Sequence, residues 1–166
     1  IKHVPSFNLY EDFWRIYTNT EHQPPEYIGE GGIVKKSIIS SGCEIYGDVQ
    51  NSVLGPQVIV EKGAVVKDSI IMQSTVIKEG TVIDRCIIDE NCVIGKNVKM
   101  GIGENVANEL KPKIYNTGIT VVGEDTNVPD NIEIGKNCVI FGNTTAQDYA
   151  EGKLPSGGTV IKEGVE

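Results

Sequence analysis

Aliphatic residues recur along this chain with a period that closes every 17 residues, and this spacing limits the folds the chain can adopt. The steps between successive aliphatic positions are 6, 6 and 5 residues, repeated. The positions are Leu54, Val60, Val66, Ile71, Ile77, Ile83, Ile88, Ile94 and Met100. A six-residue step does not keep side chains on one face of a helix with about 3.6 residues per turn. The pattern therefore excludes an amphipathic helix and favours short strands.

Two further regularities support this interpretation. The five-residue step is a repeated pentad: VKKSI (34–38), VQNSV (49–53), VKDSI (66–70) and IDRCI (83–87). The position four after each aliphatic residue is small or β-branched: Cys43, Val58, Ala64, Thr75, Thr81, Cys92 and Val98. Residues two apart share a face of a strand, so this position points inward beside the next aliphatic residue. Turns are expected at Lys62-Gly63, Glu79-Gly80 and Lys96-Asn97.

Three short strands in each 17-residue turn predict an all-β fold, a left-handed parallel β-helix of the hexapeptide-repeat type shaped as a triangular prism. Successive coils would stack about 4.8 Å apart. We expect about four coils between Ile28 and Gly101. The rhythm stops at about 102–120, where Pro112 and Gly118 predict an inserted loop or arm.

The rhythm returns after the loop. The aliphatic positions are then Val122, Val128, Ile134 and Ile140, and the small inward positions are Thr126, Ile132 and Cys138. The polar, Gly-rich tail repeats the pattern once, at VIKEG (160–164). We expect a terminal cap or an edge covered by a partner there, because an open coil leaves backbone groups unpaired.

Residues 1–27 differ in kind from the rest of the chain. They hold the only Trp and both His, and they include the aromatic residues Phe7, Tyr10, Phe13, Trp14 and Tyr17. Such a segment either packs on the first coils or docks on another domain. We therefore divide the chain into a connection at 1–27 and a β-helix domain at 28–166. Since the chain opens without Met, we expect it to be a fragment of a longer protein.

The composition bounds the partners and the compartment. A net charge of −8 and a pI near 4.8 argue against binding to nucleic acid or to an anionic membrane. No apolar run approaches the roughly 20 residues that cross a bilayer. The cysteines Cys43, Cys86, Cys92 and Cys138 show no CxxC spacing, so we expect buried thiols in a cytoplasmic protein and no metal site.

Candidate catalytic residues are scarce in the repeat. Acyltransferases with hexapeptide β-helices use a His as general base, yet His3 and His22 both precede the first predicted coil. We therefore expect no catalytic residue and no cofactor in this chain. An acyltransferase that uses acetyl-CoA stays an alternative, and specific CoA binding would favour it. Basic residues that could bind an anion, or simply be solvated turn charges, are Lys78, Arg85, Lys96 and Lys99.

Several segments resemble the C-terminal part of bacterial glucose-1-phosphate adenylyltransferases (ADP-glucose pyrophosphorylases). They are LYEDFWRIYTNTEHQPPEYI, SIISSGCEIYGDVQNSVL, EKGAVVKDSIIM, RCIIDENCVIG and the later NEL-KP-IYNTGITVVGE. The resemblance implies a part of an enzyme that makes ADP-glucose and pyrophosphate from ATP and glucose 1-phosphate for glycogen synthesis. The Mg²⁺, nucleotide and sugar sites would belong to an N-terminal catalytic domain.

The resemblance also implies a role in regulation and assembly. The β-helix would pack on its own catalytic domain, contribute to a homotetramer and help to bind a sugar-phosphate or nucleotide effector, with Arg85 as the effector-binding residue. Some relatives carry an Arg where this chain has Glu90, and a carboxylate there would repel a phosphate. A non-catalytic regulatory subunit with a similar C-terminal half is a further alternative.

Overall fold

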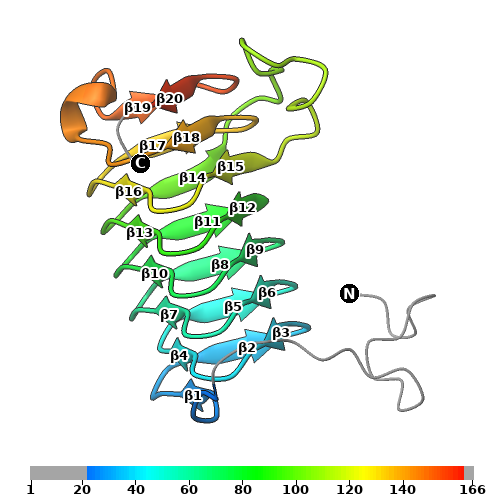
Figure 1. The fold of residues 1–166 in the computed structure, drawn as a ribbon, viewed down its shortest axis with the longest axis vertical. Coiled ribbons are helices and arrows are strands. Elements are labelled where there is room, and N and C mark those ends of the chain that lie inside the picture. Colours follow the sequence, from blue (N-terminus) through cyan, green and yellow to red (C-terminus); the bar gives the residue numbers. More distant parts are fainter. Residues whose placement is uncertain (1–21, 163–166) are drawn as a thin grey trace.

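The computed structural model describes residues 22–162, and these form a parallel β-helix (Figure 1). Its strands fall into three parallel sheets, which we name A, B and C. In each sheet every strand except the two at the ends pairs with the equivalent strand of the coil before and of the coil after it. The predicted all-β, hexapeptide-repeat fold is confirmed. Strands are only two to four residues long because a corner follows each one.

Sheet A contains β1 (Tyr27–Ile28), β4 (Glu44–Ile45), β7 (Ile59–Val60), β10 (Val76–Ile77), β13 (Val93–Ile94) and β16 (Asn127–Val128). Sheet B contains β2 (Ile33–Lys35), β5 (Asp48–Gln50), β8 (Val65–Lys67), β11 (Val82–Asp84), β14 (Lys99–Ile102), β17 (Glu133–Gly135) and β19 (Lys153–Leu154). Sheet C contains β3 (Ile38–Ile39), β6 (Val53–Leu54), β9 (Ile70–Ile71), β12 (Cys86–Ile88), β15 (Thr120–Val122), β18 (Val139–Phe141) and β20 (Thr159–Ile161).

The strand register reproduces the 17-residue period of the sequence. Val76 pairs with Val93 in sheet A, and Val82 pairs with Lys99 in sheet B. One coil is shorter, because Glu44 pairs with Ile59. The shortening lies at the corner between β4 and β5, where Gly47 packs so closely that an added Cβ would collide with the backbone oxygen of Ala64. Only glycine fits at this position, because the backbone of the next coil leaves no room for a side chain.

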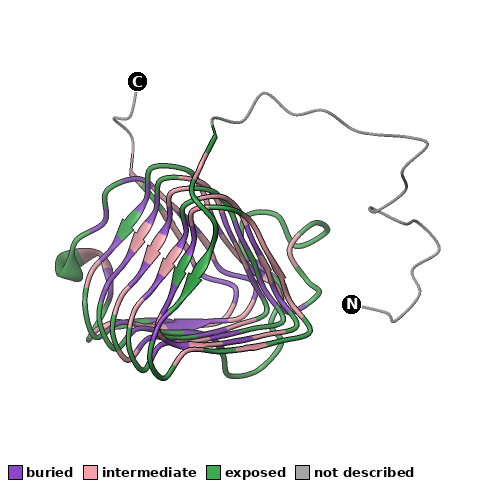
Figure 2. Ribbon diagram, turned by 90° about the horizontal axis from the view of Figure 1, so that it is seen from below, coloured by how far each residue is buried: buried purple, intermediate pink, exposed green. Residues whose placement is uncertain are grey.

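The interior of the prism is built from the residues that the period selects. All nine aliphatic positions from Leu54 to Met100 are fully buried, as are the seven small or β-branched positions from Cys43 to Val98. Thr126, Ile132 and Cys138 are buried as well. Figure 2 looks along the stack and shows buried segments facing a common interior with exposed segments outside. The predicted inward face is therefore confirmed.

The five-residue corner between sheets B and C depends on a ladder of side chains. One residue per coil adopts a left-handed conformation, for example Asp68 (φ 49°) and Arg85 (φ 55°). In three coils the next residue is a serine that turns its hydroxyl back into the corner, and after Arg85 it is Cys86, whose Sγ contacts the Asp84 carbonyl at 3.4 Å. Ser69 Oγ donates to the Lys67 carbonyl (2.6 Å) and accepts the N–H of Cys86 in the following coil (3.0 Å). A single left-handed residue and this hydroxyl replace the longer turn.

Four complete coils run from β1 to β12, and β13 and β14 begin the fifth. The regular coil is then interrupted between β14, which ends at Ile102, and β15, which begins at Thr120. We call residues 103–119 the inserted loop. It emerges at the edge between sheets B and C, at upper right in Figure 1.

The tail does more than repeat the pattern once. A 3₁₀ helix, η1 (Ala146–Asp148), follows β18, and β19 and β20 then extend sheets B and C by one more strand each. β19 was not predicted, because the segment between Gly142 and Gly152 lacks the aliphatic spacing. Tyr149 is buried beside η1, and its hydroxyl bonds to Thr144 Oγ1 at 2.8 Å. The Tyr149 ring thus belongs to the buried core at this end of the prism, where the other coils have an aliphatic side chain.

Candidate functional site

The interior offers packing and no reactive group. All four cysteines are free and buried, as predicted. Burial raises the pKa of Cys92 to about 11 and that of Cys138 to about 11, so both thiols are neutral at physiological pH. Within residues 22–162 no group of three or more His, Cys, Asp or Glu side chains could hold a metal ion. In the same range no helix has the length and apolar character to span a membrane. Within residues 22–162 the candidate binding residues are those on the outer surface.

Arg85, the predicted effector residue, stands at the corner between β11 and β12. Its side chain is exposed, and its Nη2 donates to the backbone carbonyl of Thr117 in the inserted loop at 3.1 Å. The backbone carbonyl of Arg85 accepts the N–H of Thr120 at 3.2 Å. The residue therefore contacts the end of the loop through both side chain and backbone, and its remaining guanidinium N–H groups can still meet an anion.

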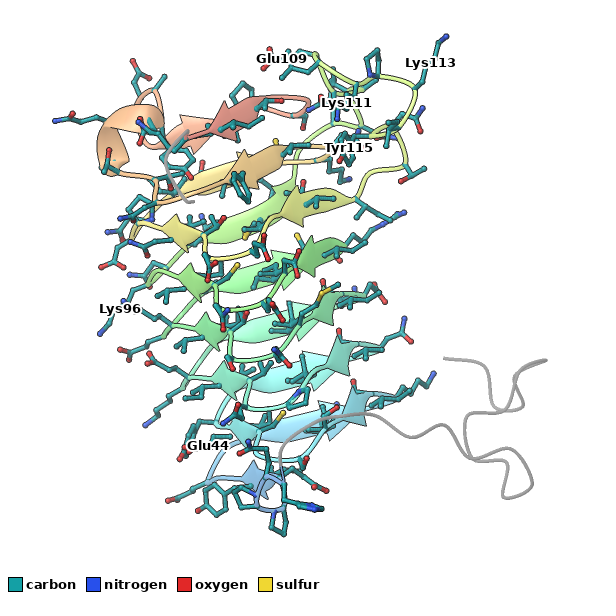
Figure 3. All side chains as sticks on the ribbon, viewed as in Figure 1. Glu44, Lys96, Glu109, Lys111, Lys113 and Tyr115 are labelled. Atoms are coloured by element: carbon teal, nitrogen blue, oxygen red, sulfur yellow. The ribbon has the colours of Figure 1, made fainter. Side chains whose placement is uncertain are left out.

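Two of the other predicted anion-binding lysines have carboxylate partners. Lys96 lies on the edge between sheets A and B (Figure 3) and pairs with Glu79 at 3.4 Å. Lys99 pairs with Glu133 at 3.1 Å, and Lys153 pairs with the same carboxylate at 3.4 Å. Hydrogen bonds and charge from these two lysines lower the pKa of Glu133. Lys78 is half-buried on the same edge. The structure does not bring these lysines together with Arg85, which lies at a different edge.

Acidic side chains gather at the edge between sheets C and A. Asp89 and Glu90 follow β12, and Glu124 and Asp125 follow β15 in the next coil. The two coils are tied there by the N–H of Asp125, which donates to the Glu90 carbonyl at 3.0 Å. The edge that contains Glu90 is therefore electronegative, in line with the repulsion expected for a phosphate.

The inserted loop is attached to the prism by buried asparagines that the sequence analysis did not identify. Asn108 is 1% exposed, and its Nδ2 donates to the carbonyls of Asn137 (3.1 Å) and Gly157 (3.1 Å). Its Oδ1 accepts the N–H groups of Leu110 and Lys111, both at 3.0 Å. These bonds hold the loop against the last coils, so it is not an arm that leaves the prism.

The loop presents apolar and basic side chains on its outer side. Leu110 is 63% exposed and Ile114 is 62% exposed, and Lys111 and Lys113 lie among them. Figure 3 shows Lys113 at the outer tip of the loop. Exposed large apolar side chains on an anchored loop are typical of a surface that contacts another protein.

The outer face of sheet C is the most apolar flat surface of the prism. Its central row runs through Ile38, Val53, Ile70, Ile87, Val121 and Val139 before it ends at Thr159. The equivalent rows of sheets A and B are interrupted by charged residues such as Glu44, Asp48 and Lys99. Six consecutive coils with a β-branched aliphatic residue facing outward indicate a packing surface. Its first four members are the last residues of the repeated pentads, but their outward orientation was not predicted.

Comparisons with known proteins agree with the fold. Residues 25–122 match the family model described as GlmU-like, C-terminal hexapeptide. The chain belongs to this family. The match begins just before β1 and ends with β15, so it covers the four complete coils and the fifth.

The GlmU-like hexapeptide domain also has close relatives among curated proteins. It is 52% identical over 164 residues to a glucose-1-phosphate adenylyltransferase of Acetivibrio thermocellus, covering 99% of this chain and 38% of the relative. It is 58% identical over 161 residues to the enzyme of that name from Lachnospira eligens, covering 97% of this chain and 38% of the relative. The enzyme of that name from Thermotoga maritima is 55% identical over 158 residues, or 95% of this chain and 37% of the relative. The chain thus spans well under half the length of these relatives.

Proposed function

We propose that this chain is the β-helix part of a glucose-1-phosphate adenylyltransferase, an enzyme that joins ATP and glucose 1-phosphate into ADP-glucose with release of pyrophosphate. The similarity to three such enzymes over nearly the whole chain carries the proposal. In this proposal ATP and Mg²⁺ bind to a catalytic domain outside this chain. Among residues 22–162 the four thiols are buried and no group of three or more His, Cys, Asp or Glu side chains could hold a metal ion, which supports that division.

The role proposed for the β-helix itself is assembly and regulation in the cytoplasm. A stack of coils with a closed aliphatic interior is a rigid body, which suits a part that holds a catalytic domain and joins subunits, here into a homotetramer. The exposed guanidinium of Arg85 is proposed as a contact for an anionic sugar-phosphate or nucleotide effector. Its bond to Thr117 would couple the effector to the inserted loop.

The proposal is tested with a chimera. The catalytic part of the Acetivibrio thermocellus enzyme is joined to this chain, and pyrophosphate release is measured with ATP, glucose 1-phosphate and Mg²⁺. We expect the chimera to be active and to assemble, while the 166-residue chain alone releases no pyrophosphate. The catalytic part without a β-helix is the control. Turnover by the isolated chain, or a chimera no better than the control, would contradict the proposal.

Arg85 is tested in the same chimera. Arg85→Ala should lower the response to an anionic activator such as fructose 1,6-bisphosphate while basal turnover is unchanged, and Arg85→Lys should retain part of the response. Lys96→Ala is a matched control, because it removes a cation at a different edge of the prism. An unchanged response in Arg85→Ala would exclude the assigned role.

A further inference from the structure

Sheets B and C end at β19 and β20, which form the last coil of the described residues, at the top of Figure 1. In the lower coils, N–H groups along each strand donate to carbonyls of the next coil. Val65 in sheet B donates to Thr81 at 2.8 Å, and Val139 in sheet C donates to Gly158 at 3.2 Å. The last coil has no further coil above it within residues 22–162, so its equivalent N–H groups need other acceptors.

The edge of β19 in sheet B is closed by its own chain. Lys153 has the register of Glu133, whose N–H donates to the Gly152 carbonyl of the next coil at 2.9 Å. The N–H of Lys153 turns back instead and donates to the carbonyl of Ala150 at 2.9 Å. Two positions later along the same edge stands Pro155, which has no N–H. Neither Lys153 nor Pro155 therefore presents a free N–H to a further strand.

The edge of β20 in sheet C is closed by the inserted loop. Thr159 has the register of Val139, so its N–H is directed past the last coil, and it donates to Oε1 of Glu109 at 3.1 Å. The backbone N–H of Glu109 donates in turn to the carbonyl of Gly157 at 2.9 Å. Figure 3 shows Glu109 at the upper end of the molecule. One loop residue thus gives the last coil both an acceptor and a donor, as a strand of a further coil would.

The path of the inserted loop is longer than its connection requires. In the coil before it, the single residue Arg85 joins β11 to β12, whereas residues 103–119 join β14 to β15. The loop extends past β17 to reach the coil of β19, two strands beyond β14 in sheet B. It is fixed there by Asn108, whose Nδ2 donates to Thr159 Oγ1 at 3.0 Å and to the Gly157 carbonyl at 3.1 Å. The additional length therefore serves to hold Glu109 against the last coil.

We infer that the inserted loop is an edge cap, which closes the last coil against the addition of a further β-strand, with Glu109 as the capping residue. The unpaired edge of a sheet is a template on which an extended segment of another molecule can pair. A carboxylate is a stronger acceptor than a carbonyl, so an incoming strand has to displace a charge-assisted hydrogen bond. It would also leave the displaced carboxylate without its donor. This role does not depend on the proposed enzyme function.

The first test removes the capping carboxylate from the 166-residue chain. Glu109→Ala frees the N–H of Thr159, so its self-association constant should exceed that of the wild type about fivefold, the effect of about one net hydrogen bond. Adding Pro155→Ala restores a second donor and should strengthen association by a similar factor. Sedimentation velocity over a concentration series measures the larger species, and thioflavin T fluorescence reports whether they contain stacked strands.

Two controls accompany this test. Glu109→Gln keeps an oxygen that can accept the N–H of Thr159, so it should sediment as the wild type does. Glu104→Ala removes an exposed carboxylate of the same loop and should also leave the association unchanged. Circular dichroism of each variant checks the fold. If Glu109→Ala sediments as the wild type does, or if Glu104→Ala associates equally strongly, the loop is not an edge cap.

A further variant separates a free N–H from a loosened loop as the cause of association. Thr159→Pro removes the donor itself, and proline is accepted on the edge strand of a sheet. Added to Glu109→Ala, it should abolish the larger species even though the contact between loop and coil stays broken. Urea denaturation shows whether the two variants differ in stability. Larger species that persist after Thr159→Pro would overturn the inference. The chimera assay reports on the proposed function separately, so each can fail without the other.

Discussion

Asn108 and Asn137 hold each other's segments in place. The carboxamide of Asn108, in the inserted loop, donates to the backbone carbonyl of Asn137 at 3.1 Å. The carboxamide of Asn137, in the coil that follows the loop, donates to the loop carbonyl of Val106 at 2.6 Å and accepts the N–H of Gly118 at 2.7 Å. Both side chains are buried, at 1% and 0% exposure. The loop is therefore fixed by a reciprocal polar pair instead of an apolar cluster.

Asn108→Ala should destabilise the protein by about 2–3 kcal/mol, since it strands several buried carbonyl and N–H groups at once. Urea denaturation measures the loss, and limited proteolysis should show cleavage in 103–119 before the rest of the chain. Asn116→Ala is the control, because Asn116 lies in the same loop, is exposed and makes one bond to Pro112. Equal losses in the two variants would contradict the anchoring role.

Ser69→Ala tests the hydroxyl ladder at the five-residue corner. The substitution leaves the N–H of Cys86 without its partner in a closed corner, while the carbonyl of Lys67 keeps the N–H of Arg85, and it should cost about 1–2 kcal/mol. Thermal denaturation monitored at 218 nm by circular dichroism serves as the measurement. Ser74→Ala provides the comparison, because its hydroxyl lies at an exposed corner with one contact at 3.4 Å. If the corner depended only on its left-handed residue, Ser69→Ala and Ser74→Ala would lower the melting temperature equally.

These two sites also mark what a single sequence can predict. The aliphatic period identified the inward residues from Leu54 to Met100, because each coil packs its inward side chains on the equivalent side chains of the adjacent coils. The pentad was visible, but the need for its hydroxyl became clear only from the bond between Ser69 and Cys86 in adjacent coils.

The loop attachments left no such signal. Asn108 contacts residues about 30 and 50 positions away, and a lone Asn in an irregular segment does not reveal a long-range partner. The outer row of sheet C was hidden for a different reason. Val and Ile favour strands on either face, so outward Ile70 and inward Ile71 are alike in sequence.

The buried thiols should make the protein less stable in alkali. Folding raises the pKa of Cys92 and of Cys138 from the ordinary 9.0 to about 11. The unfolded chain therefore loses these protons first. The stabilisation is complete below pH 9 and is lost as the pH rises from 9 through 11. Urea midpoints measured across this range should fall, and the fall should be shallower in Cys138→Ala. At pH 8 the native protein should react with Ellman's reagent only on unfolding.

Two glycines at the same edge of the prism should respond differently to alanine. An added Cβ at Gly47 would collide with the Ala64 backbone oxygen, which cannot move without disturbing the ladder of sheet B. Gly63 has a positive φ of 73°, but the nearest atom to an added Cβ is 3.9 Å away. Gly63→Ala should therefore cost only the left-handed strain, about 1–2 kcal/mol. Gly47→Ala should cost about 3 kcal/mol or more, since the short coil must open to admit the methyl group. Urea denaturation of both variants at pH 7 shows whether glycine stands at position 47 because of the close Ala64 oxygen or because of its backbone conformation. Equal losses of unfolding free energy in the two variants would rule out the steric reason.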